Sequence, residues 1–184
     1  MHPSAELSSN DTGTLMAPEV LYRVIHGSPT PEPWQKDRVR FQPALLHGYR
    51  RHRVRNAEYP GIIAEPSDSD QTETAVLGVL VSGLTEVDMY RLDRYEGAEY
   101  VKQTVRVRAL RTESHEDGKV VSGHELAKEL DAAGAGTATE GEEVVATTYV
   151  WVAGREQLEE REWDFETFKR DKLEWWVAMD ERDW

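Results

Sequence analysis

The chain has 184 residues and contains no cysteine. Disulfides, thiolate metal sites and a cysteine nucleophile are therefore excluded. Basic residues are also scarce beside acidic ones, since 22 Lys and Arg face 35 Asp and Glu, for a net charge of -13. Nucleic-acid binding and docking on an anionic membrane both depend on positive charge, so this composition argues against both kinds of partner.

Long hydrophobic runs are missing as well. The longest apolar stretch, "AVLGVLVSGL" at 75–84, is too short to cross a bilayer. The N-terminal "MHPSAELSSND" has no apolar run of the kind that marks a signal peptide. Together with the lack of cysteine, these features lead us to expect a cytoplasmic protein.

The sequence also lacks the common motifs of cofactor and nucleotide sites. It has no G-x-G-x-x-G, no Walker sequence and no G-x-S-x-G elbow. Its six histidines are scattered without the spacing of metal ligands. We therefore expect neither a metal nor another cofactor.

The length and an apolar content of 39% suit one domain with a sizeable core. Residues 1–11 are polar and show no periodicity, so we expect them to be disordered. The single domain is then predicted to cover residues 12–184. Residues 112–143 are rich in small and acidic side chains, which predicts a surface insertion that buries little area, with a short helix at "HELAKEL" (124–130).

Strand patterns dominate what remains. Apolar periodicity predicts helices from Pro18 and from Thr85, and strands within 37–63 and at 74–84, 99–110 and 144–154. The absence of regular βαβα alternation favours an α+β fold, with a small mixed or antiparallel β-barrel flanked by helices.

The C-terminal segment is predicted to add a long amphipathic helix to this fold. Its large apolar residues fall on one arc of about 100° on a helical wheel. These residues are Phe165, Phe168, Trp175, Trp176 and Met179. We expect this arc to pack on the sheet rather than to bind a partner.

Glu96 is the candidate catalytic residue that the pattern itself suggests. At about 100° per residue, Glu96 falls between Met89 and Leu92, on the face of the 85–96 helix that should be buried. Burial raises the pKa of a carboxyl, which makes it a usable acid and base near neutral pH. The alternative, which the wheel leaves open, is a carboxylate in a frayed last turn that swings into water or pairs with an arginine.

Four pieces of sequence in this order resemble the gamma-glutamyl cyclotransferase-like family, and its avirulence-induced-gene type branch in particular. They are "GTLM" at 13–16, "YPGI" at 59–62, "LDRYEGAEY" at 92–100 and the V-x-V strand that follows. The resemblance covers roughly residues 12–110 and 144–154. It implies an α+β fold built on a small β-barrel, which agrees with the reading from periodicity.

The resemblance also implies roles for individual residues. Glu96 matches the family's general acid/base, and Gly13, Thr14 and Leu15 match a loop that holds the glutamyl end of the substrate through backbone N–H groups. Tyr100 is a candidate for the pocket wall, and a core position at the start of a strand is the alternative. The implied reaction releases 5-oxoproline from a small molecule with a gamma-glutamyl group.

One departure from the family pattern is visible. Where the family has a tyrosine before Gly-Thr, this chain has Thr12, and the polar Asn10 and Asp11 stand where strand-forming apolar residues are expected. This difference predicts a poorly formed first strand and a pocket that lacks part of one wall. Two alternatives stay open: a related barrel enzyme of a specialised pathway, and a non-catalytic binding protein, which the departure at Thr12 supports.

Overall fold

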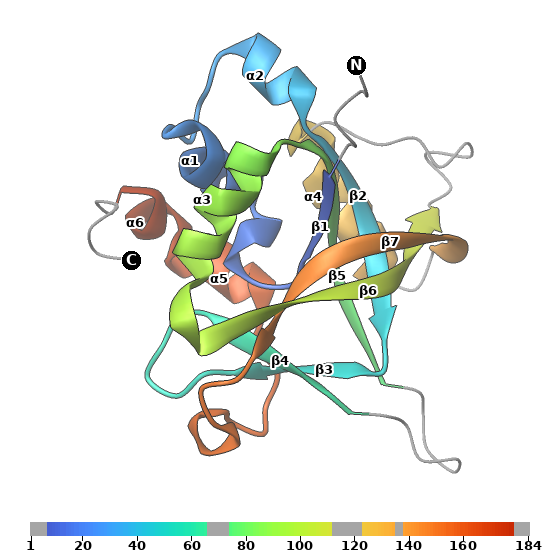
Figure 1. Ribbon diagram of the computed structural model, residues 1–184, viewed down its shortest axis with the longest axis vertical. Helices are drawn as coiled ribbons and strands as arrows, with labels where there is room; N and C mark the ends of the chain where they lie inside the picture. Colours follow the sequence, from blue (N-terminus) through green and yellow to red (C-terminus); the bar gives the residue numbers. More distant parts are fainter. Residues whose placement is uncertain (1–6, 66–73, 112–122, 135–137, 179–184) are drawn as a thin grey trace.

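The computed structural model describes residues 7–65, 74–111, 123–134 and 138–178. Five of its strands form a closed barrel in the order β1-β5-β2-β6-β7, in which β1 and β7 pair in parallel and every other pair is antiparallel (Figure 1). A separate two-stranded sheet is made of β3 and β4. The strands are β1 (Leu7–Asp11), β2 (Arg40–His47), β3 (Tyr49–Arg53), β4 (Pro60–Ala64), β5 (Ala75–Leu84), β6 (Tyr100–Arg111) and β7 (Thr139–Trp151).

The pairing register separates two hydrophobic cores. Side chains alternate across a strand, and directly opposed residues of neighbouring strands share a face of the sheet. Leu46 opposes Val76, and Val105 opposes Ala146; these four belong to one buried cluster, which fills the barrel. The opposite face of β2 and β5 joins a second, larger cluster with the helices. The barrel is thus packed on both sides of its wall.

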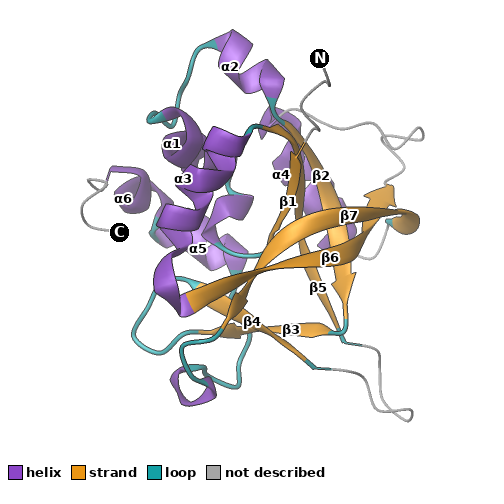
Figure 2. Cartoon of the chain, viewed as in Figure 1, coloured by secondary structure: helices purple, strands orange, loops and turns teal. Residues whose placement is uncertain are grey.

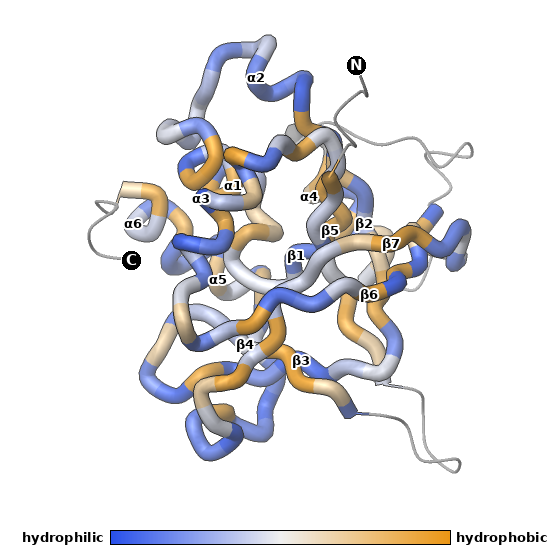
Figure 3. Tube along the Cα trace, viewed as in Figure 1, coloured by the Kyte–Doolittle hydropathy of each residue, from blue (hydrophilic) through white to orange (hydrophobic). Residues whose placement is uncertain are grey.

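The helices lie mainly on one side of the barrel (Figure 2). In the described ranges they are α1 (Pro18–His26), α2 (Pro33–Arg38), α3 (Glu86–Glu96), α4 (Gly123–Gly134), α5 (Phe165–Asp171) and α6 (Leu173–Ala178), with 3-10 turns η1 (Thr14–Met16), η2 (Gly97–Glu99) and η3 (Arg155–Gln157). Figure 3 shows how hydrophobic residues concentrate in the strands and in the helices that cover them, whereas α2 is largely hydrophilic and buries no residue. None of these helices has the length and apolar character that crossing a membrane requires.

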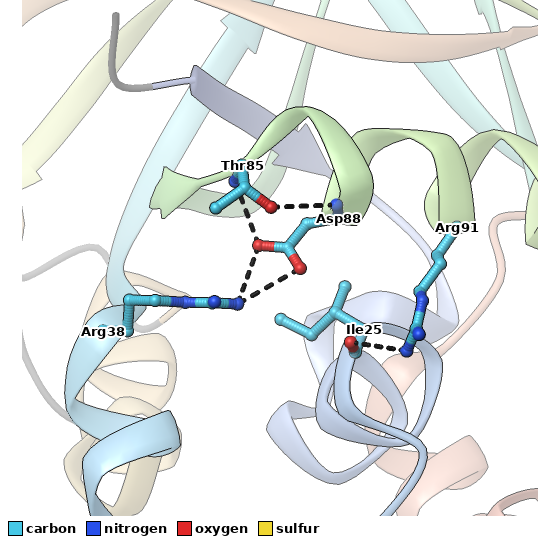
Figure 4. Close-up of polar contacts among 5 residues, drawn as sticks. All are labelled: Ile25, Arg38, Thr85, Asp88 and Arg91. Atoms are coloured by element: carbon cyan, nitrogen blue, oxygen red, sulfur yellow. Dashed lines mark hydrogen bonds and ion pairs between the residues drawn. The ribbon is translucent and has the colours of Figure 1, made fainter. Parts of the chain in front are cut away.

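Helix α3 begins at a well-defined cap. Thr85 and Asp88 form a reciprocal capping box, with side chain to backbone N–H distances of 3.1 and 3.0 Å (Figure 4). The buried Asp88 carboxylate also accepts two hydrogen bonds from the Arg38 guanidinium, at 3.1 and 2.9 Å. One turn on, Arg91 donates to the carbonyl of Ile25 in α1 at 2.9 Å. The helix is therefore fixed against α1 and the end of α2, and the predicted start of a helix at Thr85 is confirmed.

The N-terminal prediction needs a correction. Residues 1–11 were predicted to be disordered, but residues 7–11 form strand β1. Residues 1–6 lie outside the described ranges. The strand pairs with β5 on one side and β7 on the other. The strand was not predicted because its residues are polar, yet Ser9, Asn10 and Asp11 are all buried within the fold. The first strand is well formed, contrary to the expectation drawn from these polar residues.

The surface insertion predicted at 112–143 is also wrong in part. Residues 112–122 and 135–137 lie outside the described ranges, but 123–134 form α4, which packs on β2. Leu126 is fully buried in the core that the helices share with the barrel, and Leu130 is buried beside it. From Thr139 onward the chain already belongs to β7. The short helix predicted at 124–130 is therefore confirmed, whereas the prediction that this segment buries little area is wrong at Leu126 and Leu130.

The predicted long C-terminal helix is in fact two short ones, α5 and α6, which meet at Lys172. Asp164 caps α5 by accepting a hydrogen bond from the Glu166 backbone at 3.1 Å. Phe165, Phe168 and Trp176 are buried as expected, but Trp175 is 57% exposed. Because the helix is interrupted at Lys172, a wheel drawn for one continuous helix does not apply to both segments, and Met179 lies outside the described residues.

Candidate active site

A cavity of about 300 Å³ lies where the end of β1, the η1 turn, the last turn of α3 and the start of β4 come together. Residues from β7 and α6 complete its wall. The residues predicted as site residues all lie in its lining: Gly13, Thr14, Leu15, Glu96 and Tyr100. Segments that are more than 80 residues apart in the sequence thus meet around one space, as the sequence prediction required.

Glu96 is the last residue of α3. Gly97 ends the helix with φ of 73°, a left-handed value that glycine adopts without strain, and its N–H bonds the Asp93 carbonyl. Met89 and Leu92 on the same face are buried, so the wheel identified the inward face of α3 correctly. Burial, together with the charge of Asp11, raises the pKa of Glu96 to about 8. Glu96 is half-buried, because the cavity it faces leaves part of it accessible.

Asp11 is a site residue that the sequence analysis missed. It is only 3% exposed and lines the same cavity from the end of β1. Its Oδ1 accepts a long hydrogen bond of 3.3 Å from Ser9, and its Oδ2 has no partner. Burial raises the pKa of Asp11 to about 7, although the bond from Ser9 acts in the opposite direction. The available signal was a pair of polar residues at a strand end directly before the Gly-Thr-Leu turn.

The turn from Gly13 to Leu15 is held by backbone hydrogen bonds within it and by a hydrogen bond from Arg51. Met16 and Ala17 donate their N–H groups to the carbonyls of Gly13 and Thr14, at 3.0 and 3.2 Å, which closes the 3-10 turn. The buried Arg51 donates to the carbonyl of Thr12 at 3.0 Å. The amides at the start of a helical turn have no acceptor within it, so this turn presents N–H groups in the part of the chain that lines the cavity.

Aromatic side chains make much of the cavity wall. The Tyr95 hydroxyl lies 2.6 Å from Thr14 Oγ1 and accepts a hydrogen bond from Trp176 Nε1 at 2.7 Å. Tyr100 donates to the carbonyl of Pro60 at 2.7 Å, and Tyr149 donates to Asp93 at 2.6 Å. Burial raises the pKa of all three tyrosines well above the ordinary value, so they stay neutral near pH 7. Trp176 also serves the cavity, a role that the sequence analysis did not give it.

The presence of Thr12 in place of the family's tyrosine therefore leaves the cavity wall less open than expected. Thr12 itself lines the cavity and is nearly buried. Tyrosines from other elements supply aromatic surface around it. In the part of the chain that the structure describes, no three histidine, aspartate or glutamate side chains come together in a way that could hold a metal ion. The chemistry available in the cavity is that of carboxyl groups, the Arg94 guanidinium, backbone amides and neutral hydroxyls.

Comparison with known sequences gives one family. The sequence model described as "Gamma-glutamyl cyclotransferase, AIG2-like" matches residues 13–165. The chain is 29% identical over 127 residues to Protein AIG2 C of Arabidopsis thaliana and 30% identical over 131 residues to Protein AIG2 A of the same plant. These matches cover 69% and 71% of this chain, but only 56% and 57% of the relatives. The chain thus spans little more than half the length of these two relatives.

Comparison with solved structures supports the fold. Two solution structures of Arabidopsis thaliana proteins align over 96% and 94% of this chain, and over 81% and 86% of their own. Their TM-scores are 0.55 and 0.51, and their sequence identities are 23% and 24%. At such identities the likeness shows that the barrel and its helices share one architecture with these proteins.

Proposed function

The chain belongs to the AIG2-like gamma-glutamyl cyclotransferase family, and from that premise we propose that it releases 5-oxoproline from a gamma-glutamyl amine or peptide. The observation that carries the proposal is the meeting of Glu96 and the Gly13–Leu15 turn in one cavity. A volume of about 300 Å³ suits a small molecule.

The substrate supplies its own nucleophile. Its α-amine attacks the γ-carbonyl carbon and closes a five-membered lactam, while the bond from that carbon to the departing nitrogen breaks. Because the attack is intramolecular, the protein has to fold the substrate and move protons. We assign the proton transfers to Glu96, which takes a proton from the attacking nitrogen and gives one to the leaving nitrogen. A pKa raised to about 8 leaves the Glu96 carboxyl able to do both near neutral pH.

The turn at Gly13, Thr14 and Leu15 is assigned to the α-carboxylate of the substrate. Consecutive backbone N–H groups at a strand-to-helix turn form a concave site for an anion. Gly13 lies against Pro60, where an added Cβ would come within 3.0 Å of the proline ring. Glycine therefore allows the turn and β4 to approach closely on either side of the cavity. Tyr100, bonded to the Pro60 carbonyl, is assigned to the neighbouring wall.

The test is the release of 5-oxoproline from a panel of gamma-glutamyl amines and dipeptides by the wild type and by Glu96→Gln. Glutamine keeps the shape of the side chain but cannot exchange a proton, so we expect kcat to fall by about 10²–10⁴-fold. The matched control is Glu86→Gln, at the exposed first turn of the same helix, which should stay within about threefold of the wild type. Equal turnover by the wild type and Glu96→Gln would remove Glu96 from the mechanism.

A second candidate function is a binding protein that keeps the barrel and cavity without turnover. It is favoured by one observation, the threonine at position 12 in place of the tyrosine of the family pattern. The same panel separates the two candidates. Binding of gamma-glutamyl compounds by calorimetry, with no 5-oxoproline formed by the wild type, would select the binding protein.

A further inference from the structure

Asp11 brings a second carboxyl into the cavity that holds Glu96. The two residues reach it from different elements, Asp11 from the end of β1 and Glu96 from the end of α3. Asp11 is almost completely buried, yet its Oδ2 makes no hydrogen bond to the protein. Leaving a buried carboxylate oxygen without a donor is unfavourable, so an N–H group of a ligand is the partner that this position lacks.

The neighbouring residue, Asn10, also has buried polar atoms without a partner in the protein. Asn10 is 1% exposed and lines the cavity, and neither its Nδ2 nor its Oδ1 has a partner. On the register, Asn10 opposes Leu80, whereas Asp11 opposes Val79 on the helix-covered face. The end of β1 therefore carries buried polar groups on both faces of the barrel wall. Among the residues of this strand, Asp11 is the one whose charge acts on Tyr95, Glu96 and Tyr149.

The proposed reaction has more protons to move than one carboxyl can hold. The substrate's α-nitrogen begins as an ammonium with three protons and ends as a lactam nitrogen with one. Two protons must therefore leave it, and two must reach the departing nitrogen before that amine becomes an ammonium. Glu96 alone would have to release the first proton before it accepts the second.

We propose that Asp11 is a second catalytic carboxyl, which accepts the first proton from the substrate's α-ammonium group, while Glu96 protonates the leaving nitrogen and takes the second proton from the ring nitrogen. This inference rests on the proposed function. It assigns Asp11 to substrates that carry a free α-ammonium group, which its unpaired Oδ2 would bind before the proton moves.

The steps balance as follows. Asp11 begins as a carboxylate and Glu96 as a carboxylic acid. Asp11 takes one proton from the ammonium, and the free amine forms the bond to the γ-carbonyl carbon. Glu96 gives its proton to the leaving nitrogen as the bond from the same carbon breaks, and it takes the second proton from the ring nitrogen. The released amine then takes the proton from Asp11, which returns both carboxyls to their starting states.

The starting protonation states, Asp11 as a carboxylate and Glu96 as a carboxylic acid, agree with the pKa shifts that their surroundings cause. Burial raises the pKa of Asp11 to about 7, and burial with the charge of Asp11 raises that of Glu96 to about 8, so Asp11 ionises first. The other titratable or charged residues of the lining are Tyr59, Arg94, Tyr95, Glu99, Tyr100 and Tyr149. Burial raises the pKa of each of these tyrosines, so none of them supplies a proton acceptor near neutral pH.

The first experiment compares Asp11→Asn with the wild type across pH 5–9. Asparagine fills the same volume without accepting a proton, so we expect kcat at neutral pH to fall by roughly 10–100-fold. We also expect the loss of the limb on which wild-type kcat rises with pH through about 7, the value to which burial raises the pKa of Asp11. Asp37→Asn, an exposed carboxylate of α2, is the control and should leave rate and profile unchanged.

A structural role for Asp11 gives a different result. If Asp11 only held β1 in place, Asp11→Asn would lower the rate without changing the shape of the pH profile, and this outcome would overturn the inference. Asp11→Ser is tested in parallel in case the asparagine does not fold, and melting curves report on folding for each variant. Wild-type turnover that Glu96→Gln abolishes and Asp11→Asn leaves unchanged would overturn this inference alone, while the proposed function would stand.

A second measurement does not depend on turnover. The side-chain carboxyl carbon of Glu96 is followed by ¹³C NMR during a pH titration of the wild type and of Asp11→Asn. Because the charge of Asp11 raises the pKa of Glu96, its removal should move the Glu96 titration to lower pH. Identical Glu96 titrations in the two proteins would mean that the carboxyls do not act as a pair, and the inference would fail. Absence of turnover in the wild type over the whole panel would overturn the proposed function and this inference with it.

Discussion

Replacing Glu96 with glutamine should stabilise the protein in alkaline solution, even though it removes the proposed catalytic group. Burial raises the pKa of this carboxyl from 4.5 to about 8 in the folded protein. Between these two pH values the unfolded chain releases the Glu96 proton while the folded protein keeps it. Stability therefore falls as pH rises through this window, and the whole loss is present above about pH 8.

The size of the effect follows from the same shift. Each pKa unit corresponds to about 1.4 kcal/mol, so a rise from 4.5 to about 8 corresponds to at most about 5 kcal/mol. Glu96 is half-buried against a cavity large enough for water, which softens the penalty. We therefore expect Glu96→Gln to be more stable than the wild type by about 1–3 kcal/mol at pH 8.5, and by close to zero at pH 4.5.

Urea unfolding curves, measured at several pH values between 4.5 and 9, test this expectation. The difference in unfolding free energy between Glu96→Gln and the wild type should grow with pH and then level off. Glu86→Gln, on the exposed first turn of α3, is the control and should follow the wild type at each pH. A constant difference across the range would show that Glu96 titrates in the folded protein as it does in the unfolded one. The reasoning that links its burial to its chemistry would then be refuted.

Two further predictions concern the parts of the fold that position the site. Gly78→Ala should weaken β1, because an added Cβ would lie 2.6 Å from the carbonyl oxygen of Asp11. We expect a loss of about 2–3 kcal/mol in urea unfolding and a lower 5-oxoproline rate. Gly134→Ala, at the end of α4 with no atom within 4 Å of the new Cβ, is the control and should lose less. Leu126→Ala should destabilise the protein by about 2–5 kcal/mol, because this side chain of α4 is fully buried, and a change below about 0.5 kcal/mol would support a surface insertion after all.

The elements with strong periodicity or a clear cap could be predicted from the sequence. The run at 75–84 reads as a buried strand and is β5, with both of its faces packed. Thr85, Asp88 and Gly97 mark the two ends of α3, and the structure places the helix between them. Such signals are local, because they depend on residues within a few positions of each other.

The misses share a different physical cause. Strand β1 is polar, and it is a strand because β5 and β7 supply its hydrogen bonds from far along the chain. Helix α4 contains the short helix that "HELAKEL" at 124–130 indicated, but the docking of its two leucines on the barrel was missed because the acidic background suggested an exposed segment. In both cases tertiary contacts decide the structure, and no window of the sequence contains them.

The residues of the candidate site also divide into those that local sequence signals predict and those that tertiary contacts bring together. Glu96 could be found from the sequence because it stands at the end of a helix whose buried face is readable. The signal for Asp11, a pair of polar residues shortly before the Gly-Thr-Leu turn, does not by itself mark a site, because its place in the same cavity as Glu96 depends on the pairing of β1 with β5 and on the docking of α3.

The capping box and the Arg38–Asp88 ion pair fix one end of α3, and over its 11 residues a helix extends about 16 Å. Its other end then carries Glu96 to a fixed position in the cavity. Tyr95, hydrogen-bonded to Thr14, and Asp93, hydrogen-bonded to Tyr149, hold the last turn of the helix beside the cavity, so contacts at both ends of α3 position Glu96.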